Sequence, residues 1–439
     1  MTGGGGIVAD AASRDAGLRR GIGTFALAAA IVNIVIGGGI FSLPAGMARA
    51  AGPYALVAYL LCALAMAAVV LCFAEAGSRV ASSGGVYGYV EAAFGPLAGF
   101  VSGVLLWLSC VLACGGIAAG FADALAGFIP ALATTWGRDA VIVAIIAVLT
   151  VVNLAGVRPA SRLIGAVTAV KLIPLAIFVL VGLFWIDPAK LHAGTVPDVG
   201  GIGRAILLSL FAFQGMETTL SVSGEVDNPA RTLPRALIGA MAFVTIAYVA
   251  IQWVAQGLLG GALAGAKAPL AMAMATIDPR LGLLLLVGTA ISLGGWIGSD
   301  LLGAPRVLFA FARDGFLPRA LGRLSTRQVP ANAIVVHAAI AIVLAATGTF
   351  EALAILSALV GCALYIAGCA AAWRLRARNV RLDGTPLRLP VLGLWVVLGI
   401  GSMAACIALG RSSEIAALAG VILGSALLYR IARSRNPAR

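Results

Sequence analysis

The stretch "IVIGGGIFSLP", residues 34–44, lies in the middle of the apolar segment 22–48, which is about long enough to cross a bilayer. Three consecutive glycines, Gly37, Gly38 and Gly39, stand near its centre. Each lowers helix propensity by roughly 1 kcal/mol relative to alanine. Within a membrane, a broken helix is tolerated only where the freed backbone groups face protein or a watery cavity. The stretch therefore predicts a helix that is interrupted at membrane depth.

The composition of the whole chain excludes a soluble protein. Of the 439 residues, 61% are hydrophobic and only 11% are charged, and the mean hydropathy is +1.06. A soluble protein of this length needs more charge to cover its surface. Apolar runs recur from end to end, so we predict an all-α polytopic membrane protein with 12 transmembrane helices. Their expected ranges are 22–48, 52–73, 96–122, 139–156, 163–185, 203–222, 235–256, 281–305, 332–348, 352–373, 389–409 and 414–430.

The net charge of +13 indicates membrane orientation rather than nucleic-acid binding. Most lysines and arginines fall in the tails and in alternate loops between the predicted spans. By the positive-inside rule, this bias places both termini in the cytoplasm, and we expect a bacterial inner (plasma) membrane.

A second interruption follows five spans after the first. The segment "FAFQGMETTLSVSG", residues 211–224, carries Gly215 and the acidic Glu217 at membrane depth. Five is odd, so two five-span units would have opposite topology, as in inverted-repeat transporters. The predicted organisation is a tail at 1–21, repeats at 22–185 and 203–373, two further helices at 389–430 and a tail at 431–439.

The two interruptions offer complementary backbone groups. Unwinding at Gly37–Gly39 exposes amide N–H groups at the positive end of the following half-helix, and these suit a carboxylate. Unsatisfied carbonyls around Phe211–Gln214 suit an ammonium group. Together they predict a site for a zwitterion. The structural alternative is that the glycines only allow close helix packing, and the paired second interruption makes it the less favoured one.

Several motifs together resemble the amino acid–polyamine–organocation (APC) permeases. They are "IGGGIF" in the first span, "SSGGVYGYVEAAFGPLAGFVSGVLLWLSC" leading into the third, "FAFQGMET" with "EVDNPARTLPRA" through the sixth, and "PRVLFAFARDGFLP" after the eighth. The resemblance implies the five-plus-five (LeuT-like) fold, alternating access and amino-acid substrates. It places the substrate carboxylate on the amides of Gly38 and Gly39 with Ile40 alongside, and the amino group near carbonyls of Val35, Phe211 and Gln214.

Within that family, "WLSCVLAC" and "LGGW" are similar to the bacterial arginine/agmatine antiporter. The similarity implies that Trp296 packs on the substrate and that Cys110 and Cys114 line its side-chain pocket. That antiporter has a polar amide at Cys114 and a tryptophan at Phe211, so the pocket here is less polar and argues against arginine. The predicted substrate-binding residues are Val35, Gly37, Gly38, Gly39, Ile40, Cys110, Cys114, Phe211, Phe213, Gln214 and Trp296.

Three charged residues at membrane depth bear on coupling and gating. Lys171 is a lysine inside a span, where a charge costs roughly 2.5 kcal/mol or more. It resembles the lysine that occupies the sodium position in several APC members, which implies protons rather than sodium; the alternative is a fixed cation bonded to carbonyls of the first span. Glu217 is predicted to serve gating or proton linkage, or else to cap a helix. Asp300 is expected to pair with Arg306.

Other classes of function lack their residues in this sequence. The seven cysteines lie in apolar spans without metal-type spacing, and His192 and His337 are far apart, so an intramembrane enzyme or metal site is not expected. No GxxxxGK[ST] loop is present, and no cofactor or nucleic-acid partner is predicted. The expected function is a secondary active amino acid transporter, proton-coupled and sodium-independent, in contact with membrane lipid. The alternatives are an amino acid/amine exchanger and, from another class, a non-transporting amino acid sensor.

Overall fold

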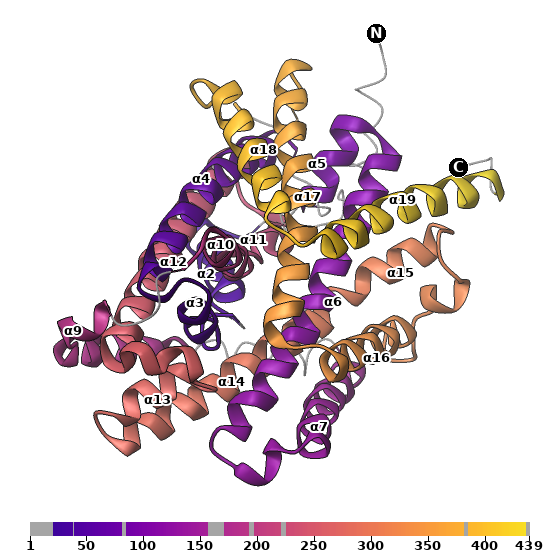
Figure 1. Cartoon of the computed structure of the whole chain (residues 1–439). Helices are drawn as coiled ribbons and strands as arrows, with labels where there is room; N and C mark the ends of the chain where they lie inside the picture. The colour runs from indigo at the N-terminus through magenta and orange to yellow at the C-terminus, as the bar shows by residue number, and fades with distance from the viewer. Residues whose placement is uncertain are drawn as a thin grey trace.

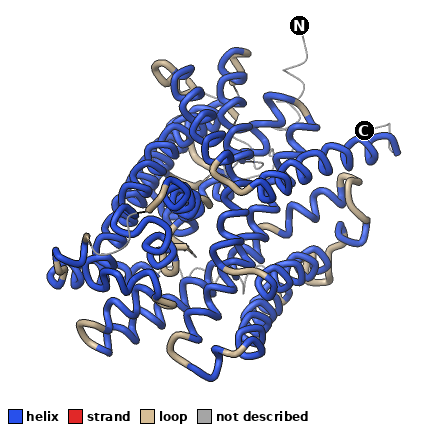
Figure 2. Tube along the Cα trace, viewed as in Figure 1, coloured by secondary structure: helices blue, strands red, loops and turns tan. Residues whose placement is uncertain are grey.

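The computed structural model describes residues 21–37, 39–80, 85–156, 171–192, 197–220, 225–381 and 385–435. Within these ranges the chain is helical, and its extended pairing is one isolated bridge between Ile22 and Val226 (Figures 1 and 2). A helix satisfies every backbone polar group inside the segment, as a bilayer requires. The predicted all-α class is confirmed.

Eight helical stretches are long and apolar enough to cross a membrane. Four shorter apolar helices lie within the remaining four predicted ranges to within one residue at their outer limits: Thr24–Val35, Lys171–Trp185, Ala331–Thr347 and Leu392–Ala408. The eight stretches are Leu43–Arg79, Pro96–Ala126, Thr135–Leu154, Val199–Thr219, Pro229–Gly265, Pro279–Arg313, Phe350–Ala377 and Ser412–Ser434.

Helices make up most of the described chain. In chain order they are α2 (Thr24–Val35), α3 (Leu43–Ala51), η1 (Gly52–Tyr54), α4 (Ala55–Arg79), α5 (Gly85–Phe94), α6 (Pro96–Ala126), η2 (Pro130–Ala133), α7 (Thr135–Leu154), η3 (Leu183–Trp185), α9 (Pro188–Leu191), α10 (Val199–Phe213), α11 (Met216–Thr219), α12 (Pro229–Leu259), η5 (Gly260–Gly265), α13 (Pro269–Ala275), α14 (Pro279–Gly303), α15 (Pro305–Arg313), η6 (Arg319–Gly322), α16 (Ala331–Thr347), α17 (Phe350–Ala377), α18 (Leu392–Ala408) and α19 (Ser412–Arg435). The helix Lys171–Trp185 precedes α9 and includes η3.

Local sequence explains where several helices begin. A proline occupies the first helical position of α6, α12, α14 and α15, where its missing N–H costs nothing. Side chains cap others: Asp198 accepts from the Gly201 amide at 2.6 Å, and Thr349 accepts from the Ala352 amide at 3.2 Å. Such caps satisfy amides that have no partner within the helix.

Small residues let the central helices approach closely. The helix α6 packs along α17 and α16, and α12 packs along α4 (Figure 1). A Cβ added to Gly115 would lie 2.9 Å from Leu344 in α16, and one added to Gly116 would lie 3.2 Å from Leu353 in α17. Small residues at such contacts are typical of membrane helix packing.

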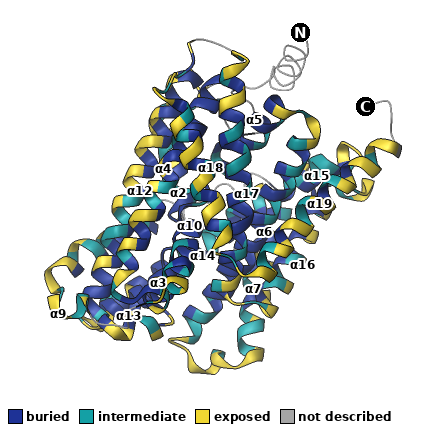
Figure 3. Cartoon of the chain, turned by 45° about the horizontal axis from the view of Figure 1, so that its top comes forward, coloured by how far each residue is buried: buried dark blue, intermediate teal, exposed yellow. Residues whose placement is uncertain are grey.

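The outer surface of the bundle is apolar. Phe25, Leu64, Ile246 and Leu423 each expose at least 70% of their surface, and exposed residues run along the outward sides of the helices (Figure 3). Apolar side chains displayed this widely suit lipid rather than water. The chain is an integral membrane protein.

Ion pairs join the helices at the end of the bundle that we call the tail face, formed by the C-terminal ends of α4 and α17. Glu75 is fully buried there and accepts from both Arg79 and Arg376. Arg378 donates to the Ala93 carbonyl of α5 at 3.2 Å.

The opposite end, which we call the loop face, is formed by the C-terminal end of α3, by η5 and by the N-terminal end of α17. Arg49 of α3 pairs with Glu351 of α17 and donates to the Ala264 carbonyl of η5 at 2.8 Å. These bonds hold α3 against α17 on this face.

Candidate functional site

Two helix breaks meet inside the bundle. The first break, residues 36–42, separates α2 from α3, and the second break, residues 214–215, separates α10 from α11. The Tyr248 hydroxyl of α12 lies 2.7 Å from the Val35 carbonyl oxygen and 2.9 Å from the Ala212 carbonyl oxygen. It thus joins the ends of α2 and α10. The predicted interruptions are present and lie side by side.

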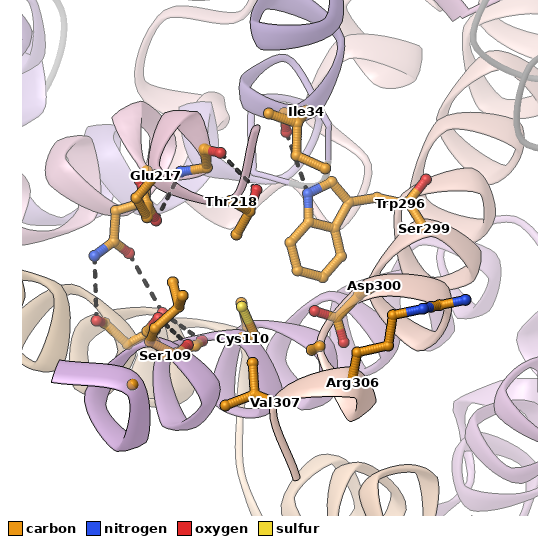
Figure 4. A pocket seen from close by; sticks show the side chains of 18 of the residues that line it. Ile34, Ser109, Cys110, Glu217, Thr218, Trp296, Ser299, Asp300, Arg306 and Val307 are labelled. Carbon is orange, nitrogen blue, oxygen red and sulfur yellow. Dashed lines mark hydrogen bonds between the residues drawn. The ribbon is translucent and has the colours of Figure 1, made fainter. Parts of the chain in front are cut away.

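A cavity of about 520 Å³ opens beside the two breaks (Figure 4). Its wall also includes residues of α5, α6, α14 and α15, and it reaches the exposed side chain of Asp314. The cavity therefore extends from the breaks toward the tail face. The predicted residues on its wall are Val35, Gly39, Cys110, Phe211, Gln214, Glu217 and Trp296.

The side chains of α14 cover the N-terminal part of the first break. Trp296 donates from Nε1 to the Ile34 carbonyl at 3.2 Å, and Ser292 donates to the Gly37 carbonyl at 2.9 Å. A Cβ added to Gly37 would lie 2.0 Å from Cδ1 of Trp296. Glycine is needed at this position because the indole ring occupies the space of a side chain.

The C-terminal part of the first break presents backbone donors. The Gly39 carbonyl accepts from the amides of Ser42 and Leu43 at 3.0 and 2.9 Å, which starts α3. Within the described chain, the amides of Gly39 and Ile40 donate to no backbone carbonyl. Free amides before a helix N-terminus suit an anion. Gly38, the central residue of the prediction, lies outside the described residues.

The second break carries its own acidic group. Gly215 has φ +118°, a backbone conformation that favours glycine, and its amide donates to both carboxylate oxygens of Glu217 at 3.0 Å. Tyr365 of α17 donates to Oε2 of Glu217 at 2.8 Å. Glu217 therefore caps α11 and links the second break to α17.

Gln214 turns its side chain toward α17. Its Nε2 donates to the Ser357 carbonyl at 3.2 Å, and the Ser357 hydroxyl donates to its Oε1 at 3.3 Å. The absence of a side chain at Gly361 makes room for it, since a Cβ there would lie 1.7 Å from Nε2 of Gln214. Among the described residues, the backbone carbonyls of Phe213 and Gln214 accept no backbone N–H at the break, so they remain available as acceptors.

Four predicted substrate-binding residues lie behind the cavity wall. Gly37 is covered by the Trp296 ring, and Ile40 is fully buried. Phe213 packs on Tyr248 with ring centroids 5.3 Å apart. Cys114 is fully buried next to Asp300. These residues support the wall rather than form it.

Lys171 lies beside the first break but not on the cavity wall. It is buried, and its Nζ donates to the Asn33 carbonyl near the end of α2. Its helix packs against α14, where a Cβ at Gly288 would lie 2.6 Å from Pro174. The ammonium group thus occupies a position between α2 and its own helix, facing a backbone carbonyl.

The expected pairing of Asp300 with Arg306 is wrong. The Asp300 carboxylate instead contacts Nε2 of His337 in α16 at 2.8 Å, although both Asp300 and Arg306 line the cavity (Figure 4). Residues six apart do not share a helix face, and α14 ends between these two. The signal in the sequence that could have indicated this pair is that an acid and a histidine both lie in apolar spans.

Asp300, His337 and Cys114 bring their potential ligand atoms within 4.8 Å of one another. Yet Trp107 donates from Nε1 to Nδ1 of His337 at 3.2 Å. An indole nitrogen only donates, so Nδ1 accepts and the histidine proton lies on Nε2. A metal ion would need the Nε2 lone pair, so the group does not fit a metal in this arrangement.

Comparison with known proteins agrees with this architecture. The model of a family described as amino acid permease matches residues 22–424. The branched-chain amino acid permease BcaP of Lactococcus lactis subsp. cremoris is 31% identical over 350 residues, covering 74% of this chain and 75% of the relative. The serine/threonine exchanger SteT of Bacillus subtilis is 30% identical over 318 residues, covering 70% and 72%.

A mammalian transporter shows a similar level of identity. The large neutral amino acids transporter small subunit 2 of Mus musculus is 30% identical over 354 residues, covering 74% of this chain and 63% of the relative. All three relatives are transporters rather than enzymes. Because the family model covers nearly the whole described chain, this protein belongs to the amino acid permease family of the APC superfamily.

Proposed function

We propose that this permease is a secondary active transporter of neutral amino acids, proton-coupled and sodium-independent, that works by alternating access. The observation that carries the proposal is the meeting of the two breaks at one cavity. We assign it 12 spans, with inverted five-helix repeats at 22–185 and 203–373 and two further helices at 389–430. The paired breaks and the 12 apolar helices support this assignment.

The substrate backbone binds between the breaks in this proposal. Its carboxylate accepts from the amides of Gly38 and Gly39, with Ile40 behind them, and its ammonium group donates to the carbonyl of Gln214. Support comes from the amides and carbonyls that lack backbone partners there. The Val35 carbonyl accepts from the Gly37 amide at 2.8 Å and lies within reach of Tyr248, so its role is to hold the break.

The substrate side chain points toward α6 and α14. The wall there contains Cys110, Ala113 and Ile117 from α6 and Trp296 from α14, which favours an uncharged side chain. The names of the relatives, which specify branched-chain, large neutral and hydroxyl-bearing amino acids, also favour neutral substrates.

The conformation is inward-facing if the termini are cytoplasmic, as the basic residues predict. The cavity then opens toward the cytoplasm through the tail face. The loop face is closed by the Arg49–Glu351 pair and, below it, by the edge-to-face contact of Phe211 with Phe350 at 5.8 Å. Alternating access requires these contacts to separate when the site opens outward.

Lys171 supports sodium independence, because its ammonium group already faces the Asn33 carbonyl. The exchanger remains the second candidate, favoured by the name of SteT, which specifies exchange. A fixed lysine suits an exchanger, whereas a lysine that releases its proton during transport suits a symporter.

The decisive experiment is uptake by purified protein in liposomes, using a panel of labelled amino acids. Uptake is measured with and without a pH gradient, with and without a sodium gradient, and with and without internal amino acid. We expect a pH gradient, acidic outside, to drive uptake from empty liposomes. An absolute requirement for internal substrate assigns exchange instead, and binding without any flux assigns the sensor.

Protein-free liposomes provide the background for this assay. Gly37→Ala, whose added Cβ meets Trp296, is expected to match that background. Flux equal to that background for every amino acid in every gradient would contradict a transporter.

A further inference from the structure

A buried carboxylate on the cavity wall has no role in the function proposed so far. Asp300 is only 7% exposed, and it lines the cavity one helical turn after Trp296. Its carboxylate contacts Nε2 of His337 at 2.8 Å, and the Cys114 thiol lies within 4.8 Å of both groups. Of His337 and Cys114, His337 is the one that donates a hydrogen bond to Asp300.

The histidine beside Asp300 is held neutral. Trp107 donates to Nδ1 of His337 at 3.2 Å, so Nδ1 cannot carry a proton while that bond exists. His337 is fully buried, and both of its nitrogens are engaged. Of Asp300 and His337, only the carboxylate of Asp300 therefore has an oxygen lone pair that can take up a further proton.

The charged groups around Asp300 do not neutralise it by contact. Arg306 of α15 lines the same cavity, and within the described chain it makes no hydrogen bond or ion pair with Asp300. From the helix before α9, Lys171 bonds to the Asn33 carbonyl. Glu217 of α11, on the cavity wall, is bonded to Tyr365.

The other helices that pack on α14 bring their ionisable groups elsewhere. Arg138 and Asp139 of α7 lie at the end of α7 opposite to Asn153, whose side chain approaches Gly298 near Asp300. The helix α13 has no charged residue, and Asp314 lies exposed beyond the end of α15. A carboxylate in such surroundings is neutralised by a cation or by a proton.

We infer that Asp300 is a proton-binding site of this permease, with His337 as a neutral donor fixed in orientation by Trp107. The inference rests on the proposed amino acid binding in the cavity, but not on proton coupling through Lys171. Protonation converts Asp300 to a neutral acid beside the subpocket for the substrate side chain. An uncharged side chain then binds without facing a negatively charged carboxylate, so proton and substrate each favour binding of the other.

The test is equilibrium binding to the purified full-length protein in detergent, where no gradient exists. The probe is whichever of L-leucine, L-serine and L-threonine binds best. We expect wild-type affinity to increase about tenfold from mildly alkaline to mildly acidic pH, because tenfold coupling lies within the usual range. Asp300→Asn mimics the protonated acid and should bind at every pH as tightly as wild type does in acid.

Two further variants separate a proton site from a structural role. Trp107→Phe removes the indole N–H and frees Nδ1 to take a proton, so the pH profile should move to more alkaline pH. Asp278→Asn changes an exposed acid on the same helix, where asparagine is an equally good N-cap, and should keep the wild-type profile.

Three outcomes would overturn the inference: pH-independent affinity in wild type, an unchanged pH profile in Asp300→Asn, or stoichiometric Zn²⁺ binding that depends on Cys114. Failure of the transport proposal is distinct. If liposomes show no flux while the Asp300-dependent profile persists in detergent, transport is wrong and the proton site stands. Retention of that profile in Lys171→Ala supports two separate groups.

Discussion

Both breaks interrupt a helix at glycine, but they differ in the side chains that surround them. The first is built from glycines without functional side chains, and it is covered by Trp296 and Ser292 from another helix. The second depends on one glycine at φ +118° and carries its own carboxylate, Glu217, within two residues. The second break is therefore capped by its own sequence, whereas the first leaves amides open toward the cavity.

This difference suggests that the first break binds the ligand and the second supports the structure. Amides without a backbone partner at the first break suit a ligand that binds reversibly. The bonds from Glu217 to Gly215 and Tyr365 suit a fixed support that moves together with α17. Substitutions should consequently affect ligand binding most at the first break and protein stability most at the second.

The largest effect on binding is expected from Gly37→Ala. The new methyl group would lie 2.0 Å from Trp296 and 2.8 Å from the Ile34 carbonyl, so the indole must leave its position over the break. We expect binding and uptake to be abolished, as measured with the best substrate of the panel. Gly239→Ala, at a helical glycine with no atom within 4 Å, is the matched control and should behave as wild type. Wild-type affinity in Gly37→Ala would remove the first break from the binding site.

The next largest effect is expected from Gly215→Ala, and it should fall on stability. A side chain at φ +118° is strained even though the nearest atom, in Ile34, is 3.4 Å away. Such strain costs of order 1–3 kcal/mol. We expect a lower thermal unfolding temperature together with reduced uptake. Gly424→Ala in α19, which meets no atom within 4 Å, controls for the added methyl group. Equal unfolding temperatures in the two variants would show that the second break is not a support.

A comparable effect on stability is expected when Glu217 is replaced. Alanine leaves the Gly215 amide and the Tyr365 hydroxyl without their acceptor, which costs about 1–3 kcal/mol. Glutamine keeps one acceptor oxygen and should lose less stability. Thermal unfolding of both variants, with Tyr365→Phe as a third, measures this order. If Glu217→Gln and Glu217→Ala have the same unfolding temperature, the charge of Glu217, and not its hydrogen bonds, stabilises the second break.

The smallest effect on binding is expected from Lys171→Ala. The lysine bonds to the Asn33 carbonyl before the first break, and it does not line the cavity. We expect affinity within about fivefold of wild type, because the loss of one hydrogen bond to a carbonyl costs about 1 kcal/mol when water replaces the donor. Uptake driven by a pH gradient should be lost while exchange persists. Undiminished gradient-driven uptake would reject the proton role of Lys171.

Much of the fold was predictable because it depends on local properties of the chain. The hydropathy of segments of about 20 residues located the helices, and the glycines located both interruptions. The motifs also identified the family correctly, since the family model matches residues 22–424. The four shorter helices, such as Thr24–Val35, lie in predicted ranges because an interrupted or tilted helix has the same composition as a continuous one.

The details of the site were less predictable. Cys110 and Cys114 are one turn apart on α6, yet Cys110 lines the cavity and Cys114 lies behind the wall. Sequence spacing shows that two residues share a face, but not which of them a neighbouring helix covers. The pairing of Asp300 with His337 joins α14 to α16. It was not predicted because the two residues lie on different helices and are far apart in the sequence.

By itself, the sequence determined that this protein is embedded in a membrane and that two of its helices are interrupted. Both properties follow from short-range chemistry: apolar surface per segment and backbone freedom at glycine. Only the tertiary structure decided that the interruptions meet at one cavity, that Trp296 covers Gly37, and that Asp300 faces a neutral histidine. These contacts depend on how each helix is rotated about its axis, and that rotation is set by packing against neighbouring helices.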